Sequence, residues 1–281
     1  MQKFLRRYYL FFTAVAFAAF FVSFVFPFVL SIYLSFAQIT SPFEANFAGV
    51  KNFAGILSDK DFINSLLLTG KFAIVCAISV NVISYFLALF IKYALKNSDI
   101  FKSLFFLPNL ISAIAVGYFC QAFVAEISTP FFKLLGISSS LPSFWGLVFT
   151  LNWQLIGFMS LIYISAMGTV SKEVIEAARL DGASSLKIFL NLKIPAFIPA
   201  ALISFFLVLI NAFKVFEQNL AFDTALKSNK TQLIVLDIYN TFYSKTALEG
   251  AAQAKAAVFF AVFAFLFFIL FKILKKRGIK L

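Results

Sequence analysis

Residues 64–91 read NSLLLTGKFAIVCAISVNVISYFLALFI and carry a single charged side chain, Lys71. A helix rises 1.5 Å per residue, so an apolar helix of this length can cross about 30 Å of hydrocarbon. Comparable apolar runs occupy residues 10–36, 103–125, 144–167, 195–216 and 251–274. The sequence therefore predicts an all-α integral membrane protein with six transmembrane helices.

The composition supports a membrane protein and excludes several kinds of chemistry. Hydrophobic residues make up 62% of the chain and charged residues only 13%, whereas an ordinary soluble domain is roughly one quarter charged. There is no histidine, and both cysteines, Cys76 and Cys120, lie inside apolar runs. Most zinc, haem and serine–histidine chemistry is thereby removed, and we expect no metal site.

The net charge of +12 is explained by the positions of the basic residues. Lysine and arginine lie mainly between the apolar runs and at the two ends. Fifteen fall on one side of the six-helix arrangement and eight on the other, which predicts that both termini are cytoplasmic. We therefore expect the chain to contact a lipid bilayer and no nucleic acid.

Two features of the apolar runs, the first run itself and Lys71 in the second, can each be interpreted in two ways. The run from Leu10 to about Phe36 follows basic residues, as a signal peptide does, but it exceeds the usual 7–15 apolar residues, so we interpret it as a first span. Lys71 lies about two turns inside the second run, towards the outer face. A side chain that snorkels to the headgroups is favoured over a role in transport.

We expect one transmembrane domain, residues 1–281, with a core at 60–275 and a cytoplasmic loop at 171–195. Outside the membrane, Asn219 to Gly250 forms a long mixed segment. Its apolar residues at spacings of three and four predict a helix that lies flat on the membrane or packs on the mouth of the bundle. These residues are Leu233, Leu236, Tyr239 and Tyr243.

The only long cytoplasmic loop reads SKEVIEAARLDGASSLKIFLNLKIPAFIP, from Ser171 to Pro199. Its sequence predicts a helix over Lys172 to Leu180, a sharp turn at Gly182 and a second short helix capped by Ser184. A compact knob of this kind suits docking on a partner, with Leu180 and Phe189 as apolar anchors. A solvated connection between helices is the alternative.

This loop resembles the EAA signature of ABC importer permeases. The matching stretches are Glu176-Ala177-Ala178, Asp181-Gly182-Ala183 and Leu192-Lys193-Ile194-Pro195. In family members, EAA is followed by three residues, a glycine, nine residues and then I-x-L-P. This chain keeps the spacing, but the two aliphatic residues before the proline are exchanged, so that it reads L-x-I-P. The match predicts that the loop contacts an ATPase, and the residues carried over are Glu176, Ala177, Ala178, Asp181, Gly182, Phe189 and Pro195.

The resemblance extends from about Gly49 to Lys276 and is closest to the carbohydrate-uptake branch with maltose-type and glycerol-phosphate-type permeases. Supporting pieces are Gly49 to Phe53, Phe106-Leu107-Pro108, Trp153, Gly157-Phe158 and Lys214-Val215-Phe216-Glu217. The branch's glycine-rich segment is missing and is replaced by Asp223 to Asn229. Sugar, sugar alcohol, glycerol phosphate and other small polar solutes therefore all stay open as substrates, and the resemblance to this branch favours a sugar or sugar-like solute.

Membership of that family would imply a multi-pass subunit of a bacterial cytoplasmic (inner) membrane. The subunit would assemble with a second, different permease chain, two ATPase subunits and an extracytoplasmic binding protein. The chain itself is not expected to be an enzyme or to bind a cofactor, because Gly70-Lys71 is preceded by Ser65 where a P-loop needs glycine. ATP and magnesium would bind the partner ATPase.

Polar residues in the fourth and fifth runs predict a substrate path. Asn211, Lys214 and Gln218 are spaced by three and four, which places them on one face of a helix. Amides with an aromatic ring suit sugar hydroxyls and pyranose faces. The fourth run contributes Asn152, Trp153 and Gln154. The alternative is that Trp153 anchors at the membrane interface and the amides lie at a helix end.

Hydropathy alone also permits a secondary transporter or channel for a small polar solute. Such proteins usually carry ionisable residues in mid-span, and here only Lys71, Lys214 and Lys255 approach that position. A membrane enzyme is disfavoured because no carboxylate pair, metal cluster or activated nucleophile lies in a span.

Overall fold

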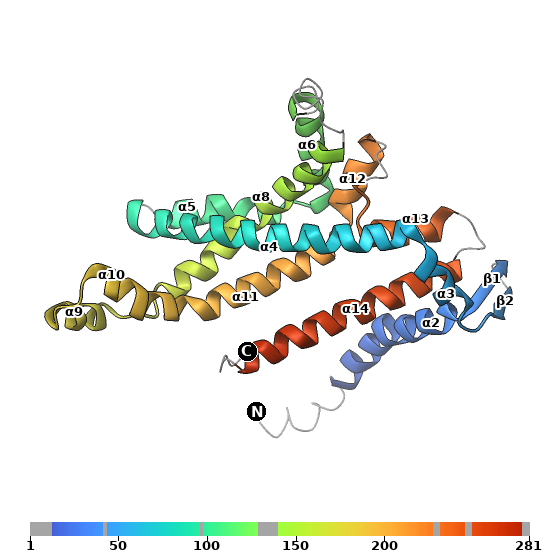
Figure 1. The fold of residues 1–281 in the computed structure, drawn as a ribbon, viewed down its shortest axis with the longest axis horizontal. Coiled ribbons are helices and arrows are strands. Elements are labelled where there is room, and N and C mark those ends of the chain that lie inside the picture. The colour runs from blue at the N-terminus through green and yellow to red at the C-terminus, as the bar shows by residue number, and fades with distance from the viewer. Residues whose placement is uncertain are drawn as a thin grey trace. The chain divides into compact units, whose positions relative to one another are not determined.

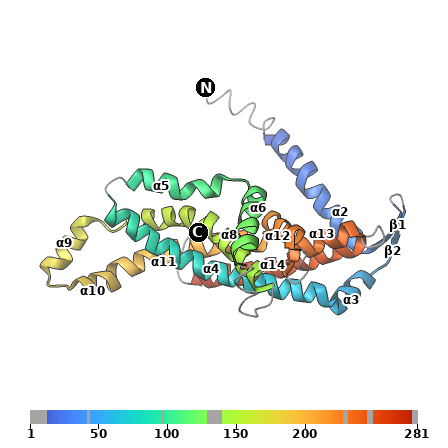
Figure 2. The ribbon, with the colours of Figure 1, turned by 90° about the horizontal axis from the view of Figure 1, so that it is seen from above.

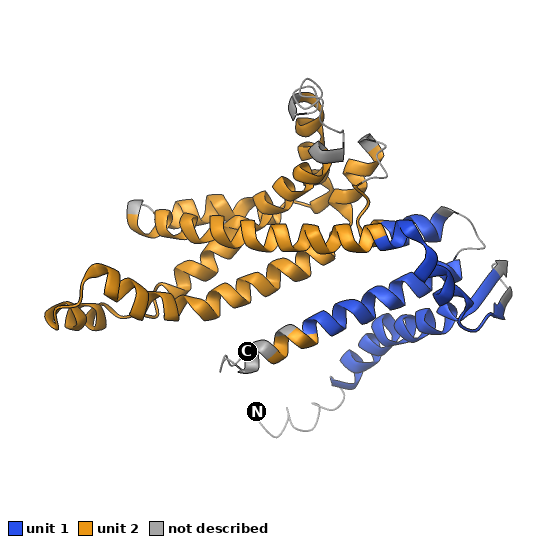
Figure 3. Cartoon of the chain, in the orientation of Figure 1, with its two compact units in different colours: residues 1–63, 237–267 blue, residues 64–236, 268–281 orange. Residues whose placement is uncertain are grey.

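The computed structural model describes residues 13–41, 44–95, 98–128, 140–226, 231–244 and 249–276. Helices dominate the described residues (Figure 1). The chain divides into two compact units, shown in Figure 3. Unit 1 comprises residues 1–63 and 237–267, and unit 2 comprises residues 64–236 and 268–281.

Unit 1 begins with the helical stretch Thr13–Ser35, which contains the π-helical turn η1 (Phe21–Val25) and α2 (Phe26–Ser35). This agrees with the predicted first span, whose residues 10–12 lie outside the described residues. The short helix α3 (Lys51–Ser58) and most of α14 (Glu249–Lys276) complete the unit. Phe28 of α2 packs edge-to-face on Phe260 of α14, with ring centroids 5.0 Å apart.

A two-stranded antiparallel hairpin follows α2 and was not predicted. Strand β1 (Ala37–Ser41) pairs with β2 (Glu44–Phe47), with Ala37 opposite Phe47. Asn52 Nδ2 donates to the carbonyl oxygens of Ser35 and Ala37, both at 2.9 Å, and so fixes the hairpin to α3. A Cβ atom on Gly250 would lie 2.0 Å from the Ala37 oxygen, so the start of α14 requires glycine there.

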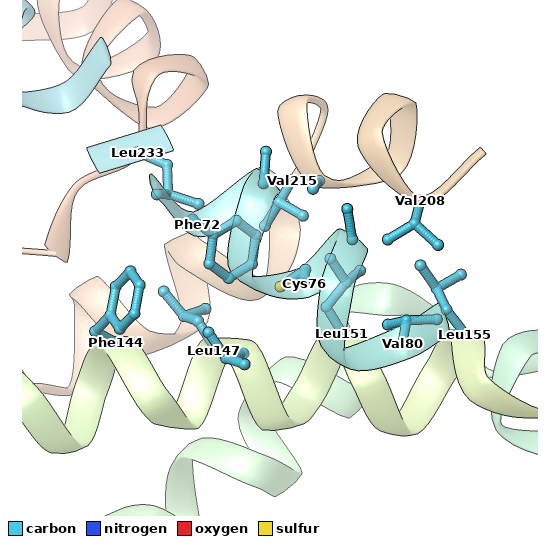
Figure 4. Packing of buried hydrophobic residues seen from close by; sticks show 14 of the residues in the cluster. Phe72, Cys76, Val80, Phe144, Leu147, Leu151, Leu155, Val208, Val215 and Leu233 are labelled. Carbon is cyan, nitrogen blue, oxygen red and sulfur yellow. The ribbon is translucent and has the colours of Figure 1, made fainter. Parts of the chain in front are cut away.

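The core of unit 2 is built from three long helices: α4 (Lys60–Ala94), α8 (Ser140–Ala166) and α11 (Ile194–Phe213). Phe72, Cys76 and Val80 of α4 face Leu147, Leu151 and Leu155 of α8 (Figure 4). Val208 of α11 joins this fully buried cluster. Residues three and four apart share a helix face, which explains why these positions meet in one apolar seam.

The third predicted span, 103–125, is broken. Residues Ser98–Leu110 and Ala113–Glu126 form two helical pieces that meet at 93°. The pieces contain α5 (Ser98–Phe106), the 3₁₀ turn η2 (Leu107–Leu110), α6 (Ala113–Phe123) and the π-helical turn η3 (Val124–Ser128). Pro108 begins the tight turn, and Ile111 then adopts extended backbone with ψ 140°. Among the described residues, five continuous helices are long and apolar enough to cross a membrane, and the number reaches the predicted six when the bent pair is counted as one span.

Glycine allows α5 to lie directly on α8. A Cβ atom on Gly157 would lie only 1.7 Å from the carbonyl oxygen of Phe105. The α5 backbone therefore contacts the α8 backbone with no side chain between them.

The fifth span ends at Phe213, earlier than the predicted 216, and two shorter helices follow it. These are α12 (Glu217–Leu226) and α13 (Ile234–Ser244). The predicted apolar face of the segment is only half buried: Leu233 and Leu236 are fully buried, whereas Tyr239 and Tyr243 are exposed. The two tyrosine rings instead contact each other, with centroids 4.6 Å apart.

Candidate coupling loop and substrate path

The loop with the EAA-like sequence forms two capped helices. Helix α9 (Lys172–Leu180) begins at Ser171, whose hydroxyl accepts from the Val174 N–H at 3.5 Å. Helix α10 (Ser185–Ile188) begins at Ser184, whose hydroxyl accepts from the Lys187 N–H at 3.3 Å. The predicted first helix and the predicted Ser184 cap are both confirmed.

The turn between the two helices depends on Gly182. Its φ is +80°, in the left-handed region that favours glycine. The Ala183 N–H bonds to the Ala178 carbonyl at 2.9 Å, which closes a Schellman-type ending to α9. The caps and this turn give the loop a defined shape, as the sequence predicted.

Apolar side chains of the loop are left uncovered in this chain. Leu180 is 90% exposed and Leu186 67% exposed. Glu176, Ala177 and Asp181 are also exposed, and Ala178 is half-buried. An exposed apolar tip on a capped helix pair is the arrangement expected of a docking surface.

Phe189 is placed differently from Leu180. It is half-buried and begins η4 (Phe189–Lys193), a π-helical turn that leads directly into α11. Its side chain lines an apolar pocket together with residues of α4 and α11. Pro195 occupies the first turn of α11, as predicted. Figure 2 shows α9 and α10 at the end of unit 2 where α11 begins.

Four of the six residues predicted for the substrate path line one pocket of about 370 Å³. They are Gln154, Asn211, Lys214 and Gln218. Asn109 and Glu217 add polar groups that the sequence interpretation missed, and Leu151 and Leu155 contribute apolar wall. The pocket lies where the third span breaks, because Ile111 and Ala113 also line it.

Two buried glutamines connect the broken span to α12. Gln218 Nε2 donates to Gln154 Oε1 at 2.7 Å, and Gln154 Nε2 donates to the Ile111 carbonyl at 3.4 Å. A carbonyl at a helix break in an apolar environment needs a donor. Gln154 supplies it and at the same time places its amide at the pocket wall.

The prediction that Asn211, Lys214 and Gln218 share one helix face is wrong, although all three line the same pocket. Only Asn211 lies within α11; Lys214 ends that helix, and Gln218 belongs to α12. The chain turns at Lys214 to Phe216, and this turn folds the three polar groups around one space. Asn211 and Lys214 are exposed, whereas Gln218 is buried.

Asn152 and Trp153 do not line the pocket. Asn152 is buried, and its Nδ2 donates to the Val148 carbonyl of its own helix at 2.7 Å. Trp153 is 36% exposed and lies against Phe119, with ring centroids 6.3 Å apart. Successive residues of a helix point in different directions, so of these neighbours only Gln154 reaches the pocket.

The remaining lysines of the apolar runs have different environments. Lys71 is exposed, with Nζ 5.4 Å from the centroid of the Phe144 ring. Lys255 is buried and ion-paired in unit 1: its Nζ lies 2.8 Å from Asp59 Oδ2 and 2.9 Å from Asp237 Oδ2. Nothing in the sequence pointed to this cluster.

The pKa values of the two carboxyl groups in the cluster are shifted in opposite directions. Burial raises the pKa of Asp237, and this outweighs the hydrogen bond and the charge of Lys255. Burial also raises the pKa of the more exposed Asp59, but bonds from Lys255 and from the Phe62 and Asp61 N–H groups outweigh it and lower the pKa overall. The same lysine therefore faces one carboxyl whose pKa is lowered, Asp59, and one whose pKa is raised, Asp237.

Comparisons with known proteins agree with this architecture. Residues 96–280 match the family described as binding-protein-dependent transport system inner membrane component. The probable starch degradation products transport system permease protein AmyD of Thermoanaerobacterium thermosulfurigenes is 34% identical, over 91% of this chain and 89% of that protein. The multiple sugar-binding transport system permease protein MsmF of Streptococcus mutans is 23% identical, over 91% of both.

The fold is also found in solved structures. A chain of a bacterial ABC transporter involved in the import of the acidic polysaccharide alginate superimposes with a TM-score of 0.74 at 18% identity, covering 99% of both chains. The chain of the same kind of transporter in complex with an alginate pentasaccharide-bound periplasmic protein gives 0.76 at 17% identity. This chain therefore belongs to the binding-protein-dependent transport system inner membrane component family and is a multi-pass permease subunit of an ABC importer.

Proposed function

We propose that this permease carries a carbohydrate-like solute and that the pocket at the broken third span lies on its path. The pocket that joins Gln154, Asn211 and Gln218 is the observation that carries this proposal. Amides both donate and accept hydrogen bonds, as sugar hydroxyls do, and the apolar wall suits a sugar-ring face. A volume of about 370 Å³ lies within the range of small-molecule sites. Relatives named for starch products and multiple sugars support the same class.

The assembly we infer contains a second, different permease chain, two ATPase subunits that bind ATP and magnesium, and an extracytoplasmic binding protein. A bacterial inner membrane with both termini cytoplasmic would place the EAA-like loop beside the ATPases. The chain lacks a P-loop sequence, so the work of transport would come from those partners.

A continuous helical path supports coupling between the loop and the pocket. Residues Ser185–Phe213 form one 29-residue helical stretch that includes α10, η4 and α11, roughly 43 Å long. One end carries Leu186 of the exposed loop, and Asn211 near the other end lines the pocket. We propose that nucleotide-driven movement of the ATPases displaces the loop and that this helix transmits the displacement to the pocket.

The test is uptake by the complete importer, purified with its native partners and reconstituted in liposomes. Radiolabelled maltooligosaccharides, glycerol 3-phosphate and a neutral amino acid would be compared, each with the binding protein present. We expect uptake of the sugar, and a strong loss of uptake for Asn211→Ala and Gln218→Ala while ATP hydrolysis continues. Gln121→Ala, an amide on α6 outside the pocket, is the matched control. Equal uptake by the pocket and control variants would exclude the proposed path.

A further inference from the structure

A pair of lysines, Lys92 and Lys193, lies at the end of unit 2 near the loop. Lys92 near the end of α4 and Lys193 in η4 both lie over the ring of Tyr93, with Nζ 5.9 Å and 5.6 Å from its centroid. Lys102 of α5 adds positive charge near Lys92 but is neutralised by Asp99 at 2.7 Å. Within the described part of the chain, neither Lys92 nor Lys193 forms an ion pair. Two like charges on one ring repel each other, and an anion between them would relieve that repulsion.

An apolar groove lies near these lysines, although neither lysine lines it. It has a volume of about 400 Å³ and lies between α4 and α11, where Val82, Phe86, Phe197 and Ala201 line it. Phe86 precedes Tyr93 by seven residues, so the two share a helix face about 10 Å apart along the axis. Ile194, which also lines the groove, directly follows Lys193.

Two of the polar residues that line the groove are hydrogen-bonded to each other. The Tyr163 hydroxyl donates to Asn81 Oδ1 at 2.7 Å, and both residues line the groove. The residues that line the groove are mostly apolar and include no charged side chain, and the positive charge of Lys92 and Lys193 lies beyond one end of it. This polarity matches an amphiphile with an anionic head.

The position of the groove identifies the class of amphiphile. Both walls belong to helices that are long and apolar enough to cross a membrane, so a lipid is an available ligand for this groove. The distance along α4 from Val82 to Lys92 is about 15 Å, which is half the thickness of the hydrocarbon core. A lysine pair at the end of such a groove is the arrangement that binds anionic lipid headgroups.

We propose that this groove binds one anionic phospholipid, with its phosphate between Lys92 and Lys193 and an acyl chain along Val82, Phe86 and Phe197. Phe189, which begins the turn between the loop and α11, also lines the groove. The bound lipid would thus hold the base of the loop against α4. This site is independent of the transported solute.

The experiment is native mass spectrometry of the full chain in mild detergent, titrated separately with phosphatidylglycerol and phosphatidylcholine. We expect one tightly held phosphatidylglycerol and no equivalent phosphatidylcholine. The double variant Lys92→Gln/Lys193→Gln should bind phosphatidylglycerol roughly 30-fold more weakly, from about 1 kcal/mol per lysine. Lys51→Gln/Lys60→Gln, which removes two exposed lysines at the starts of α3 and α4, should bind it as the wild type does.

A second variant tests the acyl chain. Ala201→Phe fills the groove and should abolish phosphatidylglycerol binding, with its thermal unfolding temperature measured to confirm that the protein is folded. Binding of water-soluble glycerol 3-phosphate as tight as that of the lipid, with no effect of Ala201→Phe, would show a free-phosphate site and overturn the proposal.

The last measurement repeats the native mass spectrometry on the assembled importer. Retention of the phosphatidylglycerol adduct by the purified complex supports the proposal. Loss of the adduct in the complex, together with its presence on the isolated chain, would show that another subunit covers the groove in the working protein, and would overturn it.

Discussion

Lys255 Nζ lies 2.9 Å from Asp237 Oδ2, and the two side chains are only 5% and 6% exposed. The same ammonium group lies 2.8 Å from Asp59 Oδ2 and donates to Thr241 Oγ1 at 2.9 Å. A single lysine of α14 thus joins α13 to the residue that precedes α4. Removing one partner of a buried ion pair is costly because the other charge stays buried without compensation.

We predict that Lys255→Met destabilises the protein by about 3 kcal/mol, measured by thermal unfolding in detergent. The double variant Lys255→Met/Asp237→Leu should recover much of that loss, because it removes the uncompensated carboxylate as well. Lys51→Met, at an exposed lysine, controls for the change of charge. A Lys255→Met protein as stable as this control would contradict the importance of the ion pair.

The contact between Gly157 and Phe105 gives a second prediction. Gly157→Ala places a methyl group where the Phe105 carbonyl oxygen now lies, so α5 must move away from α8. Forced overpacking of this kind typically costs 1–3 kcal/mol, and we expect a lower unfolding temperature and lower uptake. Gly70→Ala is the matched control, since a Cβ atom there meets nothing within 4 Å. Equal unfolding temperatures for the two variants would refute the close approach.

Asp223 predicts a pH dependence of stability. Burial raises the pKa of this α12 carboxyl above its ordinary value of 3.8, and its Oδ1 accepts no hydrogen bond within the described residues. As the pH rises, the Asp223 carboxyl therefore loses its proton at a higher pH in the folded protein than in the unfolded chain. The contribution of Asp223 to the free energy of unfolding is fully present below pH 3.8 and is lost as the pH rises through the folded-state pKa.

Replacing Asp223 with asparagine, which does not ionise, removes this loss of stability at higher pH. We expect Asp223→Asn to raise the unfolding temperature more at pH 7 than at pH 4, measured against wild type in the same buffers. Asp181→Asn, at an exposed position, should show no such difference. A gain that is larger at pH 4 would reverse the sign argued here.

Gly182 tests the coupling loop. A Cβ atom there meets nothing within 4 Å, so substitution acts only through the φ of +80°. Asparagine tolerates this region and valine does not. We expect Gly182→Val to reduce sugar uptake while ATP hydrolysis continues, and Gly182→Asn to keep most uptake, both measured on the reconstituted importer. Unchanged uptake and hydrolysis in Gly182→Val would argue against docking through this turn.

The sequence predicts the long helices because each carries its signal in a local run of apolar residues. The same holds for the loop, where Ser184 and Gly182 act within a few residues of their own positions. The hairpin at Ala37 to Phe47 carries no such signal, because two short strands of mixed polarity lack a periodic pattern. The break at Ile111 was missed for two reasons. Pro108 lies in the first turns of the run, where a helix tolerates proline, and hydropathy averaged along the run does not register a change of direction.

In the candidate site, too, the residues with a local sequence signal were predicted and the others were not. Gln154, Asn211, Lys214 and Gln218 were found because polar groups are rare in spans and tend to face interior spaces. Asn109 was missed because the turn that exposes it to the pocket was not predicted. The cluster of Lys255 with Asp59 and Asp237 joins residues up to 196 positions apart, and no spacing rule connects residues so distant.

The 93° break in the third span also bears on how the protein is made. Helix α6 packs mainly against α12, and Gly117 lies so close to Gln218 that a Cβ atom there would be 2.9 Å from its Cα atom. Ribosomes synthesise α12 about a hundred residues after α6, which at 5–20 residues per second is roughly 5–20 s later. During that interval the nascent α6 lacks its partner, and the Ile111 carbonyl has a donor only once Gln154 has emerged. Membrane integration of this segment is therefore completed by later parts of the chain, and a product truncated before Glu217 would be a natural substrate for quality-control proteases.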